Sequence, residues 1–116
     1  MNVVTPRVMR ALFWAAALAA LTMALLPHPP ELPGHPSDKV QHIAAFATLG
    51  LLGSFAYPRV SPVWLIGGLS LFGALIEAAQ AIPALHRDAD RFDWMADTAA
   101  CAVVVLAARW WRRRKR

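Results

Sequence analysis

Six ionisable residues lie within or beside stretches of sequence that are otherwise apolar. They are Asp38, Lys39, His42, Glu77, Asp93 and Asp97. A charged side chain at membrane depth is costly and usually serves a function. Carboxylates beside an imidazole can relay a proton, act as general acid and base, or hold a divalent metal ion. These residue types therefore predict one polar site, and the sequence leaves the choice among these chemistries open.

The spacing of the polar residues places them on shared helix faces. Residues three or four apart lie on the same side of a helix. Three such sets occur in the sequence: Asp38 with His42, Glu77 with Gln80, and Asp90 with Asp93 and Asp97. Each set therefore predicts a helix that presents polar groups on one side.

The same residues support three kinds of role. In a catalytic role, His42 or Glu77 is the base, and Asp93 and Asp97 hold a metal ion, so the catalytic candidates are His42, Glu77, Asp93 and Asp97. In a binding role, Lys39 and Arg87 at the rim receive a phosphate or carboxylate group. In a purely structural role, charged pairs between helices hold a small bundle together.

Four apolar stretches carry these residues. The chain has 116 residues, 58% of them hydrophobic, and a mean hydropathy of +0.42. One small soluble core cannot bury that much apolar surface. We expect an all-α membrane protein with four transmembrane helices in an up-and-down bundle, over residues 8–26, 38–57, 62–82 and 92–111. His42, Glu77 and Asp97 then lie on one side of the bilayer, about 6 to 8 Å below the helix ends.

The distribution of Lys and Arg predicts the orientation of this bundle. Basic residues gather before the first stretch, in the second loop and in the tail: Arg7, Arg10, Arg59, Arg109, Arg112, Arg113, Arg114, Lys115 and Arg116. In the third loop, acidic residues offset Arg87 and Arg91. The positive-inside rule therefore places both termini in the cytoplasm and the polar site outside. We expect a multi-pass protein of the bacterial cytoplasmic (inner) membrane.

The basic tail and the small residues indicate partners. Trp110 and Trp111 precede the basic tail, which is typical of a membrane interface with anionic lipid and not of a nucleic-acid site. Glycines in the apolar stretches favour close contacts between helices, and faces of Gly and Ala can also form a homodimer. The glycines concerned are Gly50, Gly53, Gly67, Gly68 and Gly73.

Two sequence blocks resemble the VanZ-like family of membrane proteins. The first is SDKVQHIAAFATLGLL, residues 37–52, which is similar to the family's Asp-Lys, His and Ala-Phe pattern. The second resembles the family's Glu-x-x-Gln, Arg, Asp-x-x-Asp and Ala-Asn/Asp pattern, through Glu77, Gln80, Arg87, Asp90, Asp93, Ala96 and Asp97. Asp97 stands where many members have Asn, and Ala100 stands where Gly often follows. The first departure can alter the charge of the site, and the second can alter helix packing.

The resemblance covers residues 8–108 and implies one VanZ-like membrane domain over residues 1–116. The family is named for a protein associated with low-level teicoplanin resistance, but the resemblance implies no particular reaction or cofactor. We expect binding of an anionic envelope lipid or cell-wall precursor through the outer polar site. The alternatives are a membrane enzyme acting on a lipid-linked substrate, and a structural or assembly subunit whose polar residues only stabilise the bundle.

Overall fold

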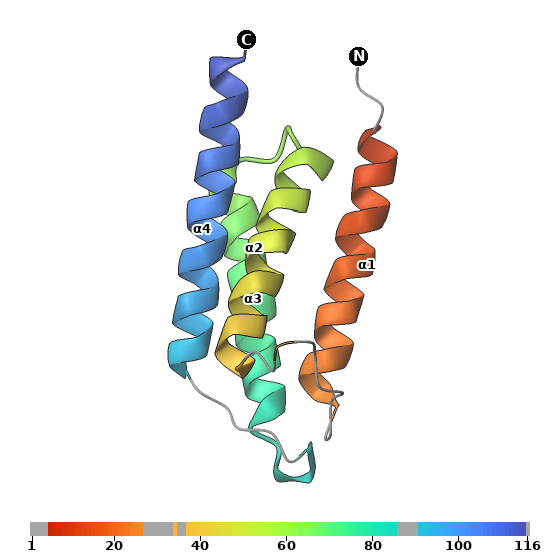
Figure 1. Cartoon of the computed structure of the whole chain (residues 1–116), viewed down its shortest axis with the longest axis vertical. Coiled ribbons are helices and arrows are strands. Elements are labelled where there is room, and N and C mark those ends of the chain that lie inside the picture. Colours follow the sequence, from red (N-terminus) through yellow and green to blue (C-terminus); the bar gives the residue numbers. More distant parts are fainter. Residues whose placement is uncertain (1–4, 27–33, 35–36, 86–90, 116) are drawn as a thin grey trace.

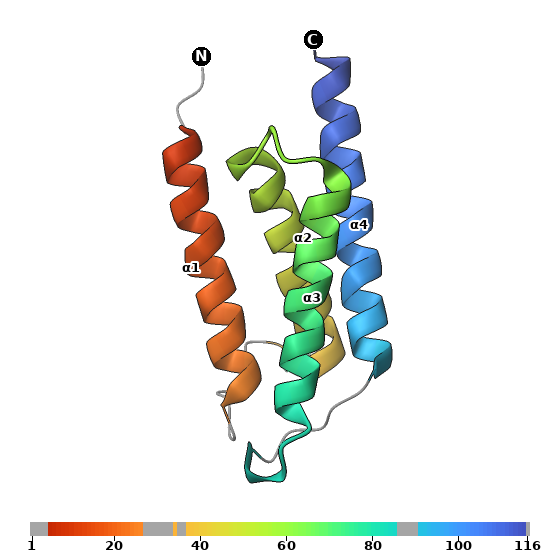
Figure 2. The ribbon, with the colours of Figure 1, turned by 180° about the vertical axis from the view of Figure 1, so that it is seen from behind.

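The computed structural model describes residues 5–26, 34, 37–85 and 91–115, and the secondary structure of this part of the chain is entirely helical. Four long helices run alternately up and down, so that the start of α1 and the end of α4 lie at the same end of the bundle (Figures 1 and 2). The elements are α1 (Pro6–Leu25), α2 (Asp38–Ala56), α3 (Pro62–Gln80), the short 3₁₀ helix η1 (Pro83–Leu85) and α4 (Arg91–Arg114). The predicted all-α fold with four helices is confirmed.

Local sequence explains where three of the helices begin. The side-chain oxygen of the residue before the helix accepts a hydrogen bond from a backbone N–H three residues later, at 3.3 Å for Thr5, 3.2 Å for Ser37 and 3.4 Å for Ser61. These bonds satisfy N–H groups that have no partner within the helix. Pro6 and Pro62 occupy the first turns of α1 and α3, where a missing N–H costs nothing.

Some helix ends differ from the predicted spans. The third span was predicted to reach residue 82, but α3 ends at Gln80 because Pro83, at the start of η1, has no N–H with which to continue the helix. The fourth span was predicted to end at residue 111, whereas α4 continues to Arg114. Hydropathy marks where an apolar run stops, and a helix can continue beyond it into charged residues.

The centre of the bundle lies between α2 and α4, the pair of helices that pack most closely. Leu49, Cys101 and Val105 are fully buried there. At Gly50, a Cβ atom would lie 3.2 Å from the carbonyl oxygen of Cys101 and 3.3 Å from Cγ2 of Val105. The missing side chain therefore allows the two helices to approach each other closely.

Not every glycine has this role. Gly53 and Gly73 also face neighbouring side chains at 3.0 to 3.3 Å from the Cβ position. No such neighbour lies within 4 Å at Gly67 or Gly68. The prediction that these two glycines make close contacts between helices is therefore wrong for the described part of the chain, because they face outward from α3.

This difference gives a matched pair of variants. We expect Gly50→Leu to lower the free energy of unfolding by about 1 to 3 kcal/mol, because added atoms overpack the contact between α2 and α4. Gly68→Leu adds the same atoms at an open position and should not destabilise the protein. Thermal unfolding in detergent micelles measures both effects. Equal melting temperatures for the two variants would contradict the close packing at Gly50.

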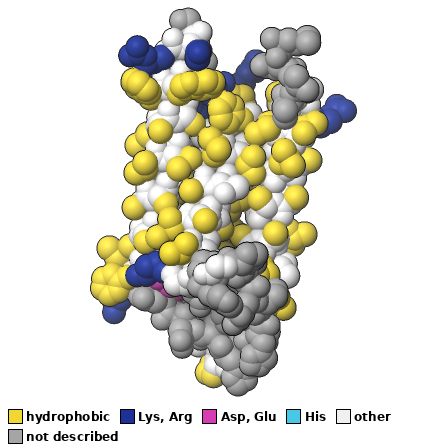
Figure 3. Space-filling model, in the orientation of Figure 1, with side chains coloured by type: hydrophobic (Ala, Val, Ile, Leu, Met, Phe, Trp, Pro, Cys, Tyr) yellow, Lys and Arg dark blue, Asp and Glu magenta, His cyan; other side chains and the backbone are white. Residues whose placement is uncertain are grey.

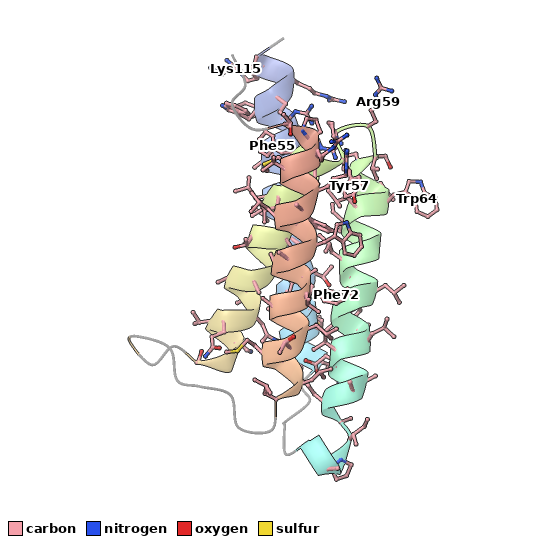
Figure 4. The ribbon with its side chains drawn as sticks, turned by 90° about the vertical axis from the view of Figure 1, so that its right-hand side faces the viewer. Phe55, Tyr57, Arg59, Trp64, Phe72 and Lys115 are labelled. Atoms are coloured by element: carbon pink, nitrogen blue, oxygen red, sulfur yellow. The ribbon has the colours of Figure 1, made fainter. Side chains whose placement is uncertain are left out.

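The outer surface of the bundle is largely apolar. Hydrophobic side chains cover the visible length of the helices, and most of the visible Lys and Arg side chains gather at the end that holds both termini (Figure 3). Leu18, Val63 and Trp64 are among the large exposed side chains, and Figure 4 shows Trp64 projecting away from the bundle. Such a continuous exposed apolar surface marks contact with lipid or with another protein.

Two helices of the described chain, α1 and α3, are long and apolar enough to cross a membrane. Only 17% and 22% of their apolar segments is buried inside the bundle, whereas the core helix of a soluble protein is mostly buried. Helices α2 and α4, with 19 and 24 residues, are also long enough, but their described residues fall short of the apolarity of a membrane-spanning helix. The prediction of four spanning helices is therefore supported by composition for two of them.

Candidate functional site

Polar side chains from three helices meet at the end of the bundle opposite the termini. His42 lies near the start of α2, Glu77 near the end of α3, and Asp93 and Asp97 in the first two turns of α4. Because α2 and α4 begin, and α3 ends, at this end (Figure 1), the alternating direction of the helices brings these residues to the same level. Together with Lys39 they are called the polar cluster below.

Specific contacts connect the members of the polar cluster. Nδ1 of His42 lies 3.5 Å from Oδ2 of Asp97, and Nζ of Lys39 lies 3.5 Å from Oδ1 of Asp93. His42, Glu77 and Asp93 each offer one ligand atom within 4.8 Å of the other two. The structure therefore places the carboxylates of Glu77 and Asp93 near the imidazole of His42, and that of Asp97 beside its Nδ1 atom.

Burial differs strongly across the polar cluster. The side chain of Asp97 is 4% exposed, and those of Asp93 and His42 are 13% and 14% exposed. Lys39 is half-exposed. Oδ1 of Asp97 is buried and has no hydrogen-bond partner among the described residues, which is unusual for a buried polar atom. The polar cluster is therefore a half-open site with one deeply buried carboxylate.

An apolar layer closes the polar cluster toward the middle of the bundle. A Cβ atom at Gly73 would lie 3.3 Å from both Cζ of Phe46 and Cδ1 of Trp94, so both rings pack against this glycine. Beyond this layer, the next charged residue on α2, α3 or α4 is Arg109, near the far end of α4. The arrangement can bind a ligand from one end, but it offers no charged path through the bundle.

Gln80 was predicted to belong to the same site, and the structure shows a contact of its amide nitrogen with α1. The side chain is 2% exposed, and its Nε2 donates a hydrogen bond of 2.9 Å to the carbonyl oxygen of Ala24. Ala24 lies in the last turn of α1, where carbonyl groups have no partner within the helix. Gln80 therefore connects α3 to the end of α1.

Three other predicted site residues cannot be placed. Arg87 and Asp90 lie outside the described residues, as does the side chain of Asp38, whose backbone begins α2. Their predicted roles in ligand binding stay predictions. The predicted metal ligands were Asp93 and Asp97. The side chains whose ligand atoms lie within 4.8 Å of one another are instead His42, Glu77 and Asp93, because the rotation of α4 about its axis turns Asp93 toward the other two.

Sequence reasoning missed two arginines that bind backbone carbonyls. Arg109 donates from Nη1 to the carbonyl of Val60 at 2.7 Å and from Nη2 to that of Tyr57 at 3.1 Å. Arg112 donates to the carbonyl of Ser54 at 3.3 Å. These carbonyls lie at the end of α2 and in the following turn, where a positive charge is favourable. Arg109 and Arg112 are three residues apart and share one face of α4, and this spacing could have indicated their common role in the sequence.

Comparison with known proteins does not identify this chain. No protein-family model, no curated protein and no solved structure matches it. The resemblance to VanZ-like proteins therefore stays a prediction from the two sequence blocks. Function has to be inferred from the polar cluster and from the surface of the bundle that carries it.

Proposed function

We propose that this chain is a VanZ-like protein of the bacterial inner membrane that spans the bilayer four times. Both termini lie in the cytoplasm, and the polar cluster faces outward. There it binds the anionic head group of an envelope lipid or of a lipid-linked cell-wall precursor. The observation that carries the proposal is the convergence of five polar side chains at one end of a bundle whose outer surface is apolar.

The surface of the bundle supports the membrane location. Helix α1 has 20 residues, which at 1.5 Å per residue is about 30 Å, the thickness of the hydrocarbon core. Its neighbours in the bundle have similar or greater lengths, and all run in alternating directions. The four helices pack side by side and have similar lengths, so they occupy the same depth. If α1 and α3 cross the bilayer, α2 and α4 therefore cross it with them.

The two ends of the bundle support the orientation. The end with the termini carries Arg59 in the turn between α2 and α3, and the basic last turn of α4. The rings of Trp110 and Trp111 lie there beneath the cations of Arg114 and Lys115, at 5.1 and 5.6 Å. Aromatic rings with basic residues are typical of the cytoplasmic interface.

The chemistry of the polar cluster supports a ligand with a phosphate and hydroxyl groups. Lys39 is half-exposed and can contact a phosphate. The carboxylates of Glu77 and Asp93, both partly exposed, can accept hydrogen bonds from hydroxyl groups. The head group of an anionic lipid can offer both a phosphate and hydroxyl groups.

A membrane enzyme acting on a lipid-linked substrate is the second candidate. It is favoured by the grouping of His42, Glu77 and Asp93 within 4.8 Å, because an imidazole and a carboxylate at that separation can serve as general base and acid on one bound group. Turnover of a lipid substrate by the purified protein would distinguish the enzyme from a binding protein.

Cysteine labelling tests the topology. We expect a cysteine at Gly34 to react with a membrane-impermeant maleimide in intact cells, and one at Arg59 to react only after the membrane is opened. Both positions are exposed. The wild-type chain is the matched control, because its single cysteine, Cys101, is buried and should not react.

Two outcomes would contradict the proposal. Labelling of Arg59→Cys in intact cells would reverse the orientation and place the polar cluster in the cytoplasm.

Native mass spectrometry of the protein, purified from the membrane in a mild maltoside detergent, should show bound anionic lipid. Its complete absence at detergent concentrations that preserve the fold would contradict lipid binding.

A further inference from the structure

We propose that His42, Glu77 and Asp93 bind a divalent transition-metal ion. They come from three different helices, and one ligand atom from each lies within 4.8 Å of the other two. Two ligands of one ion, each about 2.1 Å from it, lie about 3 to 4 Å apart. Small rotations of these partly exposed side chains therefore suffice to bring all three to the ion.

Asp97 provides an independent observation in favour of the ion. Its Oδ2 lies 3.5 Å from Nδ1 of His42. We assign Asp97 the role of a second carboxylate that orients the imidazole, which leaves Nε2 as the ligand atom for the ion. Its Oδ1 is buried with no hydrogen-bond partner among the described residues. A nearby cation offsets the cost of burying this carboxylate.

The charge balance of the polar cluster points the same way. Glu77, Asp93 and Asp97 are three carboxylates, and Lys39 provides one ammonium group. Among these described side chains the carboxylates outnumber the ammonium group, and a divalent ion bound between them supplies positive charge. The side chain of Lys39 is 50% exposed, so it can turn into water when the ion takes its place beside Asp93.

The ligand types define the class of metal. Ca²⁺ and Mg²⁺ prefer sites made only of oxygen, whereas an imidazole with carboxylates suits Zn²⁺ or Mn²⁺. Three protein ligands leave at least one position of the ion open. Resting on the proposed function, we assign that position to a phosphate oxygen of the head group, because an ion resolves the repulsion between an anionic ligand and an acidic site.

Titration with Mn²⁺ alone tests the site. The full-length protein, purified in maltoside detergent and treated with a chelator, should bind one Mn²⁺ per chain, measured by the electron paramagnetic resonance signal of the free ion. We expect Glu77→Gln and Asp93→Asn each to weaken Mn²⁺ binding roughly tenfold or more, because each replacement removes one metal ligand. Lys39→Gln should bind at least as tightly as wild type, because it removes a competing cation.

A control on the exposed face of α2 keeps the test specific. Thr48→Ala should bind Mn²⁺ like the wild-type protein, and circular dichroism with thermal unfolding should show that all variants are folded. Absence of saturable Mn²⁺ binding to the folded wild type, or equal binding by Glu77→Gln, would overturn the metal site.

The metal site and the proposed function fail in different ways. If Mn²⁺ binds as expected but no anionic lipid is retained, the metal site stands and lipid binding is wrong. If the anionic lipid remains bound after chelation and in Glu77→Gln, lipid binding stands and the bridging ion is wrong.

Discussion

Glu77→Ala, His42→Ala and Asp93→Ala are each expected to lose bound anionic lipid while the protein still inserts and accumulates in the membrane. These three side chains lie within 4.8 Å of one another at the open end of the bundle. Removing one charge-assisted contact to a ligand costs about 1.5 to 3 kcal/mol, so lipid affinity should fall roughly tenfold or more. Native mass spectrometry of the purified variants measures the lipid that remains.

The same variants distinguish a binding site from a structural cluster. If the polar side chains only stabilise the bundle, each replacement lowers the melting temperature and the amount of protein in the membrane, and bound lipid falls only in proportion to the protein. Ser54→Ala is a suitable control, because Ser54 is buried in the half of α2 away from the polar cluster and donates its hydroxyl to Gly50 within its own helix. Full lipid retention by all three alanine variants would remove these residues from the ligand site.

A large effect on stability is expected for Arg109→Ala. This change removes hydrogen bonds of 2.7 and 3.1 Å from a guanidinium group to the carbonyls of Val60 and Tyr57. Hydrogen bonds to charged groups contribute about 1.5 to 3 kcal/mol each, so we expect a loss of about 2 to 4 kcal/mol after partial compensation by water. Arg113→Ala, four residues further along at an exposed position, should leave stability unchanged.

Arg109→Lys separates charge from geometry. Lysine keeps the positive charge near the end of α2 but lacks the planar fork that reaches two carbonyls at once. We expect a stability between that of wild type and that of Arg109→Ala, measured by thermal unfolding in detergent. A lysine variant as stable as wild type would show that charge alone matters. Equal melting temperatures for Arg109→Ala and Arg113→Ala would show that the contacts with the turn contribute nothing.

The sequence by itself determined the number and order of the helices. Four apolar runs are separated by proline-containing segments, and each run forms one helix. The structure located the capping side chains of Thr5, Ser37 and Ser61, each of which acts on the helix that follows it directly. These signals are local, because capping and the lack of an N–H in proline act within a few residues. The up-and-down order then follows from the short connection between α2 and α3. This order places His42, near the start of α2, and Glu77, near the end of α3, at the same end of the bundle, as the sequence predicts.

Only the tertiary structure decided which side chains touch. The rotation of each helix about its axis is not fixed by a run that is apolar on nearly all sides, so periodicity leaves the facing residues open. Packing turned Asp93 toward Glu77 and Asp97 toward His42, and it turned Gln80 toward α1. It likewise placed Gly50, and not Gly68, at a contact between helices. Each outcome depends on contacts between residues far apart in the sequence, which the spacing within one helix does not contain.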